Sequence, residues 1–456
     1  MPVSVFPTGV VRYHPEKCWN GFTLFQASMF EGQNVGTVLI DMNGKVVKQW
    51  KGLEGFPNKM LPGGYVMGSS GVRDPKIAFQ DMTDLVQLDW EGRTVWQFNH
   101  LELIEDAGHE STWMARQHHD YQREGNPVGY YAPGLEPQAA GGRTLILAHR
   151  NVTNPAISPK PLLDDIIIEV DWQGNITWEW SASDHFEELD FPPEARQTLN
   201  RNPNLVIGEV GDWLHINSIS TLGPNRRFEA GDARFHPENI IWSSRQASIM
   251  AIIERSSGRL VWKLGPDYSA SPQLIKLGAI IGQHHIHLIP RGLPGEGNLL
   301  LFDNGGTAGY GPPGPASAEG LNCFIRDYSR VIELDPVSLE AVWQYPSFEI
   351  PGAAVMAHSR LYSKFVSSAQ RLLNGNTLIT EGGCGRFLEV TPRHEIVWEY
   401  ISPYYSLQMK MNHVYRAYRI PPEWVPQLEL GAGLPVIPAE NHLLRLDTAG
   451  SQIIQI

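Results

Sequence analysis

A hairpin-like segment that ends on tryptophan occurs six times along this chain. Each copy has alternating apolar residues, a polar turn that often holds Asp and Gly, and a second strand with Val or Ile shortly before the tryptophan. Alternation with a period of two residues around a short polar turn is typical of a β-hairpin. The copies are VLIDMNGKVVKQW ending at Trp50, LVQLDWEGRTVW at Trp96, IIEVDWQGNITW at Trp178, AIIERSSGRLVW at Trp262, VIELDPVSLEAVW at Trp343 and FLEVTPRHEIVW at Trp398.

A further strand signal precedes most of these hairpins, as in GGRTLILAHR from residue 141 and NGNTLITEGG from residue 374. Each unit therefore supplies about four strands, and such a small sheet buries both faces only by packing against neighbours around an axis. The sequence predicts an all-β fold, a single six-bladed β-propeller domain over residues 1–456. Unequal spacing of the copies predicts long loop insertions, and N- and C-terminal strands, including NHVYRAYRIPPEW, close the ring. The tryptophans are expected to wedge between blades.

Composition narrows the partners and the compartment. The chain has 456 residues with 36 Lys and Arg against 49 Asp and Glu, a formal net charge of −13 that argues against nucleic acid as a partner. Three cysteines are too few for a disulfide framework. We expect no membrane association, since no run approaches the length of a membrane span. No export signal is visible, so the prediction is cytoplasmic, or periplasmic if a signal was removed. The sequence gives no oligomeric state.

Several histidines occupy matching places just ahead of the second strand of a unit. The innermost strands of a propeller surround its central channel, so matching positions on them converge. We expect a polar cluster there, and one reading is that each imidazole simply lines the channel, bonded to water and backbone. A second reading is a metal site. The candidate metal ligands are His118, His119, His215, His284, His285 and His413.

Polar residues end the second strands. Arg150 and Arg245 fall at equivalent places and are expected to face the same opening, while Asn304 follows Asp303 in FDNG. Guanidinium groups beside imidazoles suit an oxyanion such as sulfate or phosphate. The alternative reading of these residues is turn chemistry or ion pairing.

The chain resembles the bacterial arylsulfotransferases, which move a sulfuryl group from a phenyl sulfate to another phenol without a nucleotide donor. The matching segments cover most of the chain in order and include DWLHINSI, IIWSSRQ, GQHHIH, LLLFDNGG and HVYRAYRIPP. The resemblance implies a six-bladed propeller with an active site at the channel and no required cofactor. It also implies catalytic roles for His215 and for His284, although the adjacent His285 leaves the register open.

Two family features do not carry over. The family's sulfated histidine ends a GG-x-x-H stretch, and here the stretch is GGCGR, with Arg386 in its place. A guanidinium cannot act as nucleophile at neutral pH, although it can bind sulfate oxygens. The family arginine after FDNG is also missing, so Arg326 or Arg330 would have to substitute in binding substrate.

Three hypotheses follow. The first is an arylsulfotransferase-like transferase for a small aromatic substrate, with His215 as base, His284 or His285 as replacement nucleophile or acid, and Arg245 and Arg386 neutralising the oxyanion. The second is a lyase, hydrolase or oxidase that uses Cu, Zn, Fe or Ni on the histidine cluster. The third is a propeller that binds a ligand without catalysis.

Overall fold

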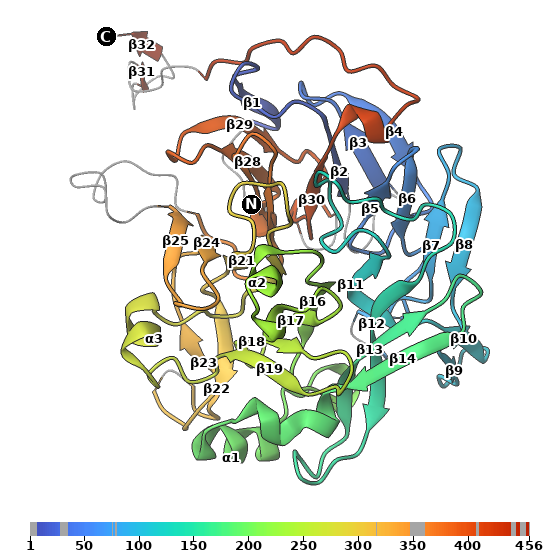
Figure 1. Ribbon diagram of the computed structural model, residues 1–456, viewed down its shortest axis with the longest axis vertical. Helices are drawn as coiled ribbons and strands as arrows, with labels where there is room; N and C mark the ends of the chain where they lie inside the picture. The colour runs from blue at the N-terminus through green and yellow to red at the C-terminus, as the bar shows by residue number, and fades with distance from the viewer. Residues whose placement is uncertain are drawn as a thin grey trace.

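The six tryptophan-terminated segments fold as the third and fourth strands of six antiparallel sheets. In the computed structural model these sheets stand around a common centre, as Figure 1 shows, and the predicted six-bladed β-propeller is confirmed. The structure describes residues 7–27, 35–74, 76–77, 80–315, 317–346, 361–406, 410–438, 444–446 and 453–455.

Each blade has four antiparallel strands, named here in order from the channel outwards. Blade one is β30 (Ala417–Ile420), β2 (Phe22–Gln26), β3 (Thr37–Ile40) and β4 (Val46–Trp50). Blade two is β5 (Lys59–Leu61), β6 (Tyr65–Gly68), β7 (Leu85–Leu88) and β8 (Thr94–Phe98). Blade three is β11 (Gln117–Arg123), β12 (Thr144–Val152), β13 (Leu162–Val170) and β14 (Ile176–Ser181), and β15 (Gly211–Asp212) pairs with β13.

The other three blades repeat the pattern. Blade four is β16 (Ile216–Thr221), β17 (Ile240–Ser244), β18 (Ile249–Ile253) and β19 (Leu260–Leu264). Blade five is β20 (His284–Leu288), β21 (Leu299–Asp303), β24 (Arg330–Leu334) and β25 (Ala341–Tyr345). Blade six is β26 (Ser368–Arg371), β27 (Thr377–Glu381), β28 (Arg386–Val390) and β29 (Ile396–Ile401), to which β1 (Gly9–Tyr13) adds an outer strand.

Strands from the N- and C-terminal parts of the chain close the ring, as predicted. The late strand β30 pairs with β2, and the first strand β1 pairs with β29. The remaining elements lie in the predicted insertions, in shorter connections between blade strands, or after Ile420. They are β9 (Glu102–Ile104), β10 (Thr112–Met114), β22 (Thr307–Tyr310), β23 (Leu321–Ile325), β31 (Leu444–Leu446), β32 (Ile453–Gln455), α1 (Pro193–Arg201), α2 (Arg226–Glu229), α3 (Pro272–Leu277) and the 3₁₀ helices η1 (Ala182–Leu189), η2 (Ile207–Glu209), η3 (Ala233–Phe235), η4 (Gly382–Cys384) and η5 (Pro422–Trp424).

Aspartates shape several of the outer hairpin turns. In the β3–β4 turn, Asp41 Oδ1 accepts the N–H groups of Asn43 and Lys45, at 3.0 and 2.9 Å. Gly44 follows with a φ of 83°, a left-handed conformation that glycine adopts without steric cost. The polar turn signal in the sequence therefore has a direct physical basis.

The apolar core lies between the blades rather than at the centre of the ring. One buried cluster, for example, joins Ile252 of β18 to Leu301 of β21, across the interface of blades four and five. The inner strands carry polar side chains at the channel, and many of these polar side chains are buried.

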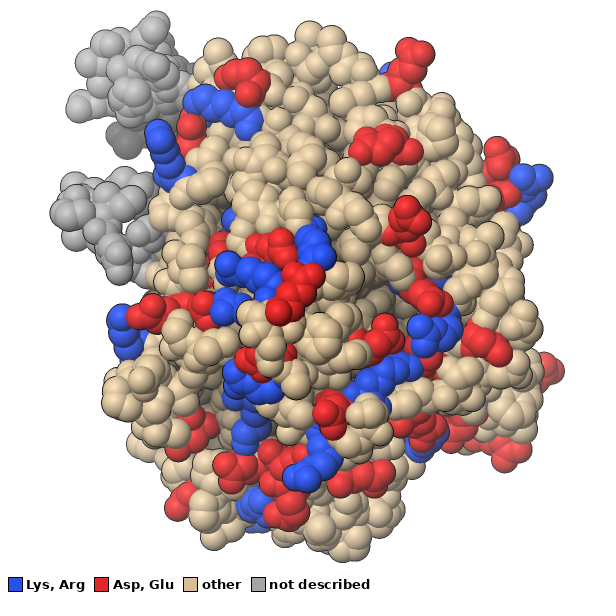
Figure 2. Space-filling model, viewed as in Figure 1, with Lys and Arg blue, Asp and Glu red and all other residues tan. Residues whose placement is uncertain are grey.

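Among the described residues, no helix is long and apolar enough to cross a membrane. On the face seen in Figure 2, acidic and basic side chains are intermixed among the described residues, and the basic ones form no continuous band.

The six tryptophans lock each blade to the next. Every indole Nε1–H donates to a backbone carbonyl in the turn between the third and fourth strands of the following blade, at 2.8 to 3.3 Å. The acceptors, in ring order from Trp50, are the carbonyls of Asp89, Trp172, Arg255, Pro336, Pro392 and Met42. The last bond, from Trp398 to Met42, returns to blade one and completes the circle. The predicted wedge between blades is confirmed.

Replacing Trp398 with phenylalanine is expected to lower the free energy of unfolding by about 1–3 kcal/mol, because the Met42 carbonyl loses its donor in a fully buried place. Trp343→Phe is the matched control, since its indole bond is solvent-exposed and its loss should cost less. Urea unfolding of both variants measures the difference. Equal losses would contradict the proposed role of buried indole bonds at the ring closure.

Candidate functional site

Irregular backbone on the inner strands aims histidines into the channel. Pairing of β11 with β12 and of β20 with β21 is interrupted, between Gln117 and Tyr121 and between His284 and His287. His119, His215 and His285 each have a φ of 54°, which is uncommon for a residue with a side chain. Bulges and left-handed residues re-aim side chains and cluster at functional sites.

A cavity of about 310 Å³ opens at this place. Three imidazoles line it, those of His119, His215 and His284, together with the guanidinium of Arg245. The remaining lining residues are Gln80, Asn204, Val206, Asp212, Phe365, Val366 and Tyr415. The volume is at the small end of ligand pockets, and the mixture of aromatic and cationic groups suits a single ring that carries an anionic group.

The tautomer of His284 follows from its neighbour Asn304. The Asn304 side-chain amide donates both hydrogens, to the carbonyl oxygens of Ser363 and Val366 at 2.8 and 2.9 Å. Its Oδ1 therefore faces His284 and accepts from Nδ1–H at 2.7 Å, and the Gly282 carbonyl also lies 3.1 Å from Nδ1. Since Nδ1 carries the proton, Nε2 of the neutral ring holds the lone pair. Burial lowers the pKa of His284 well below 6.5, so the ring is neutral at pH 7.

His215 forms a dyad with an aspartate. Its Nδ1 donates to Asp212 Oδ2 at 2.5 Å, and the two residues are three apart in sequence. Burial alone would raise the pKa of Asp212, but His215 beside it lowers the pKa overall. A carboxylate on Nδ1 orients an imidazole and stabilises its protonated form, which is the arrangement of a general base.

His119 stands beside His215, with ring centroids 4.6 Å apart. Its Nδ1 lies 2.8 Å from Nδ1 of His118, which is buried behind the cavity. Burial lowers the pKa of His119 well below 6.5, and the nearby His215 adds to that shift. Two neutral rings can share this contact only if one nitrogen donates and the other accepts.

Arg245 supplies the cation of the cavity. Its guanidinium donates to the Thr307 carbonyl at 3.0 Å and to Gln246 Oε1 at 3.3 Å, which leaves further N–H groups of its five for a ligand. The Tyr415 ring packs against Phe56 and His119, while its hydroxyl donates to the Asn217 carbonyl at 3.0 Å. The predicted substrate-binding residues Arg245 and Asn304 thus lie at or directly behind the cavity.

Three predicted arginines lie elsewhere, because acidic partners hold them. Arg150 pairs with Glu179 on the partly exposed face of blade three. Arg330 pairs with Asp303 at 2.8 Å, as does Arg326. None of the three is among the residues that line the cavity.

Arg386, the residue at the family's nucleophile position in GGCGR, is likewise held away from the cavity. Its guanidinium is buried between Glu381 and Glu399, at 3.2 and 2.7 Å, and it does not line the cavity. Cys384 in the same turn is no alternative nucleophile, since burial raises the pKa of its thiol strongly. The arginine of GGCGR therefore has a structural explanation, in the ion pairs that it forms within blade six.

The six histidines proposed as metal ligands do not form one group. His119, His215 and His284 line the cavity, whereas His118 lies behind it. His285 lies with His287 and Tyr418 further along the channel, with ring centroids 4.7 and 5.9 Å away. His413 is buried near Phe365. The open choice between His284 and His285 is thereby answered in geometric terms, because only His284 lines the cavity.

Sequence reasoning missed the acidic partners and weighted His119 too low. Asp212 stands three residues before His215 in DWLH, and that spacing was a usable signal. His119 belongs to the string Gln-His-His, which occurs at 117–119 and again at 283–285. The repetition aligns His119 with His285, yet only His119 of these two lines the cavity, so the string alone does not identify the lining residue. Asp81, His149 and Asp165 are distant in sequence, and only the ring brings them together.

Comparison with known proteins gives one family. A family model described as Arylsulfotransferase (ASST) matches residues 137–419, more than half of the chain. No match was found among curated proteins.

Solved structures of similar shape are distant. A protein of unknown function from Bacteroides caccae has a TM-score of 0.44 at 12% identity, covering 88% of this chain and 99% of its own. A putative 6-phosphogluconolactonase from Bacteroides fragilis has a TM-score of 0.35 at 10% identity, with 89% and 100% covered. The Dos1 propeller has a TM-score of 0.33 at 10% identity, with 87% and 74% covered. Similarities this low support no conclusion about the chemistry.

Proposed function

This chain belongs to the arylsulfotransferase family, and from that premise we propose that it transfers a sulfuryl group from an aryl sulfate to a phenol at the channel cavity. The donor ring would pack on the apolar side, against Phe365, Val366 and Tyr415. The sulfate oxygens would meet Arg245, whose planar guanidinium matches an oxyanion. A neutral phenol ring carries one hydroxyl, which suits the polar side formed by the imidazoles.

In the first half-reaction, Nε2 of His284 attacks the sulfur of the donor. An N–S bond forms, the bond from sulfur to the phenolic oxygen breaks, and the leaving oxygen takes a proton from protonated His215. The Nδ1 proton of His284 stays in place, held by Asn304. Arg245 would stabilise the charge on the equatorial sulfate oxygens.

In the second half-reaction, the acceptor phenol gives its proton to His215 and attacks the same sulfur. The N–S bond breaks, and His284 returns to the neutral ring with its lone pair on Nε2. His215 is protonated again, so the two halves balance. Asp212 serves both halves by holding the His215 ring and stabilising its charge.

The observation that carries this proposal is the fixed orientation of His284. Both amide hydrogens of Asn304 are committed to backbone carbonyls, so its oxygen can only present an acceptor to Nδ1. A neutral imidazole with its lone pair on the cavity-lining side replaces the nucleophile that GGCGR lacks.

The test is the release of p-nitrophenol from p-nitrophenyl sulfate in the presence and absence of added phenol. We expect release that depends on phenol, with phenyl sulfate formed in equal amount. No turnover with any phenyl sulfate, while the same compounds bind, would favour the ligand-binding propeller and contradict the proposed transfer.

The pH dependence gives a second readout. Because burial lowers the pKa of His284 well below 6.5, its Nε2 lone pair should persist as the pH falls from 8 to 6. The rate limb caused by protonation of the nucleophile is therefore expected well below pH 6.5. Single-turnover measurement of the first half-reaction across pH 4–9 isolates this limb. An acidic limb centred at or above pH 6.5 that persists in a His215→Gln background would contradict the assignment.

A further inference from the structure

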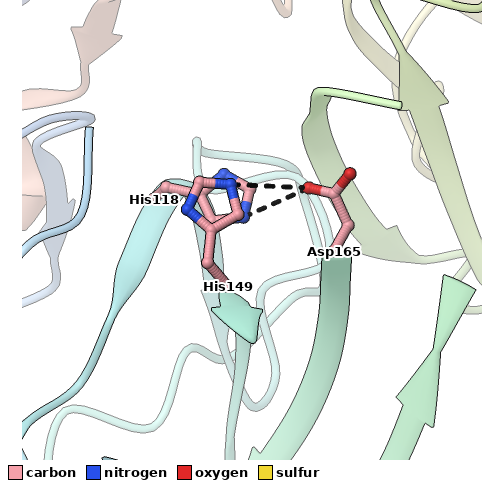
Figure 3. A group of neighbouring side chains, drawn as sticks. All are labelled: His118, His149 and Asp165. Carbon is pink, nitrogen blue, oxygen red and sulfur yellow. Dashed lines mark ion pairs between the residues drawn. The ribbon is translucent and has the colours of Figure 1, made fainter. Parts of the chain in front are cut away.

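Three ligand-type atoms meet in the protein interior directly behind the cavity. They are His118 Nε2, His149 Nε2 and Asp165 Oδ1, which lie within 4.8 Å of one another. Figure 3 shows the three side chains together, with the ion pairs to Asp165 dashed. All three side chains are fully buried, and none of the three atoms has a hydrogen-bond partner. Buried polar atoms are normally hydrogen-bonded, so three such atoms without a partner within 4.8 Å of one another require an explanation.

The spacing of the atoms matches the edges of a metal coordination shell. Asp165 Oδ1 lies 3.3 Å from His118 Nε2 and 3.9 Å from His149 Nε2. In a tetrahedral zinc site with bonds near 2.1 Å, neighbouring ligand atoms are about 3.4 Å apart. The two rings are stacked, with centroids 3.5 Å apart at 11°, so their Nε2 lone pairs run side by side, and an ion bound by both would have to part the rings.

Other residues hold these ligands in the way that metal sites are usually supported. His149 Nδ1 lies 2.6 Å from Asp81 Oδ1, which forms a carboxylate–histidine pair behind the ligand atom. His118 Nδ1 is engaged by His119 Nδ1 at 2.8 Å. The other oxygen of Asp165 accepts the backbone N–H of Ile216 at 3.1 Å. Each ligand residue is therefore held through its other polar atom, and the ligand atom itself is left without a hydrogen bond.

The charge balance of this region lacks a cation. Arg116 is committed to Asp81 and Glu102, at 2.9 and 2.8 Å. Within the described part of the chain, neither Asp165 nor Asp212 forms an ion pair with Lys or Arg. Asp212 Oδ1 is a further buried acceptor without a partner. Buried carboxylates are stable as anions only when they are paired or bound to a metal.

We propose that His118, His149 and Asp165 bind one divalent transition-metal ion, best represented by Zn²⁺. Two imidazoles and a carboxylate favour zinc or a similar ion over Mg²⁺ or Ca²⁺, which prefer oxygen ligands. This centre differs from a metal on the cavity histidines, because His149 and Asp165 do not line the cavity. Whether this ion binds does not depend on whether the protein transfers sulfuryl groups.

The ion would also set the chemistry of one cavity residue. A neutral His118 that binds metal through Nε2 carries its proton on Nδ1 and donates it to His119 Nδ1. His119 then carries its own proton on Nε2, so this nitrogen donates a hydrogen bond to a substrate in the cavity and does not act as a base. The centre thereby positions His119 for the oxygens of an anionic substrate without touching substrate itself.

The first experiment uses the wild-type full chain. The protein is purified without chelator, its metal is measured by elemental analysis, and the chelator-treated protein is titrated with Zn²⁺ while thermal unfolding is followed. We expect one ion per chain and a saturable rise of Tm with Zn²⁺ at a stoichiometry of one. Chelated protein with an unchanged Tm and no binding of Zn²⁺ would overturn the proposal. The outcome is read without any assay of sulfuryl transfer.

Variants locate the ion. His149→Gln and Asp165→Asn should weaken Zn²⁺ binding by more than about 100-fold, since loss of even a supporting residue typically costs 10–100-fold. His287→Gln is the matched control, a buried channel histidine bonded to Tyr130 that should leave binding unchanged. A Zn²⁺ ion retained by the first two variants and lost in His215→Gln or His284→Gln would place it in the cavity and overturn the assignment.

Discussion

Replacing His284 with alanine is expected to reduce kcat for phenol-dependent release of p-nitrophenol by at least about 10³-fold. The proposed transfer has no other carrier with a defined lone pair at the cavity, so the step cannot be bypassed at a comparable rate. Binding of p-nitrophenyl sulfate should be affected far less, because Arg245 and the aromatic side of the cavity remain. Steady-state kinetics and equilibrium binding on the same preparation separate the two effects.

His287→Gln provides the control for this loss. Its ring is buried on the same strand, β20, but lies along the channel and bonds to Tyr130. The control should retain activity within a few-fold of the wild type. If His284→Ala keeps comparable activity while His119→Gln or His215→Gln loses it, the carrier is a different imidazole and the assignment to His284 is wrong.

Removal of the Asp120 carboxylate is expected to destabilise the propeller by about 3–5 kcal/mol. Asp120 Oδ1 binds Lys59 Nζ at 2.6 Å, and Oδ2 binds Arg416 and the backbone N–H of Ile219, at 3.0 and 3.1 Å. These partners come from β5, from the start of β30 and from β16, so one side chain joins the inner strands of four blades. Burial alone would raise the pKa of Asp120, yet the charges of Arg416 and Lys59 lower it overall. Asp120→Ala leaves two buried cations without their partner.

The matched comparison is Glu179→Ala, which removes the carboxylate of a half-exposed pair with Arg150. Exposed pairs contribute at most about 1 kcal/mol. Urea unfolding at pH 7 measures both losses. A loss for Asp120→Ala no larger than that for Glu179→Ala would contradict the view that this carboxylate holds the inner strands together.

The fold was predictable because its signal is local and repeated. Each hairpin carries its own alternation, its polar turn and its tryptophan, and six copies specify the ring before any long-range contact is known. Ring closure was also readable, since the tail HVYRAYRIPP has a strand pattern and no other strand to pair with. The indole bond to the next blade was the physical reason for the repeated tryptophan.

The site was only partly predictable, because its geometry depends on contacts between distant blades. His215 and His284 carry local motifs, and Arg245 and Asn304 end second strands at the channel. Arg386 has the right place in sequence, but Glu381 and Glu399 hold its guanidinium, and ion-pair choice is not visible in a one-dimensional pattern. His149 and Asp165 face each other as register partners on β12 and β13, and such a pairing between strands is not visible in a motif.

The most direct test of the central claim is to trap the sulfated protein. Wild-type protein is mixed with p-nitrophenyl sulfate in the absence of phenol, quenched at alkaline pH and digested for mass spectrometry. The account predicts one burst equivalent of p-nitrophenol and the added mass of one SO₃ group on the peptide that contains His284. A modified peptide from elsewhere in the chain, or turnover without any sulfated protein, would contradict it.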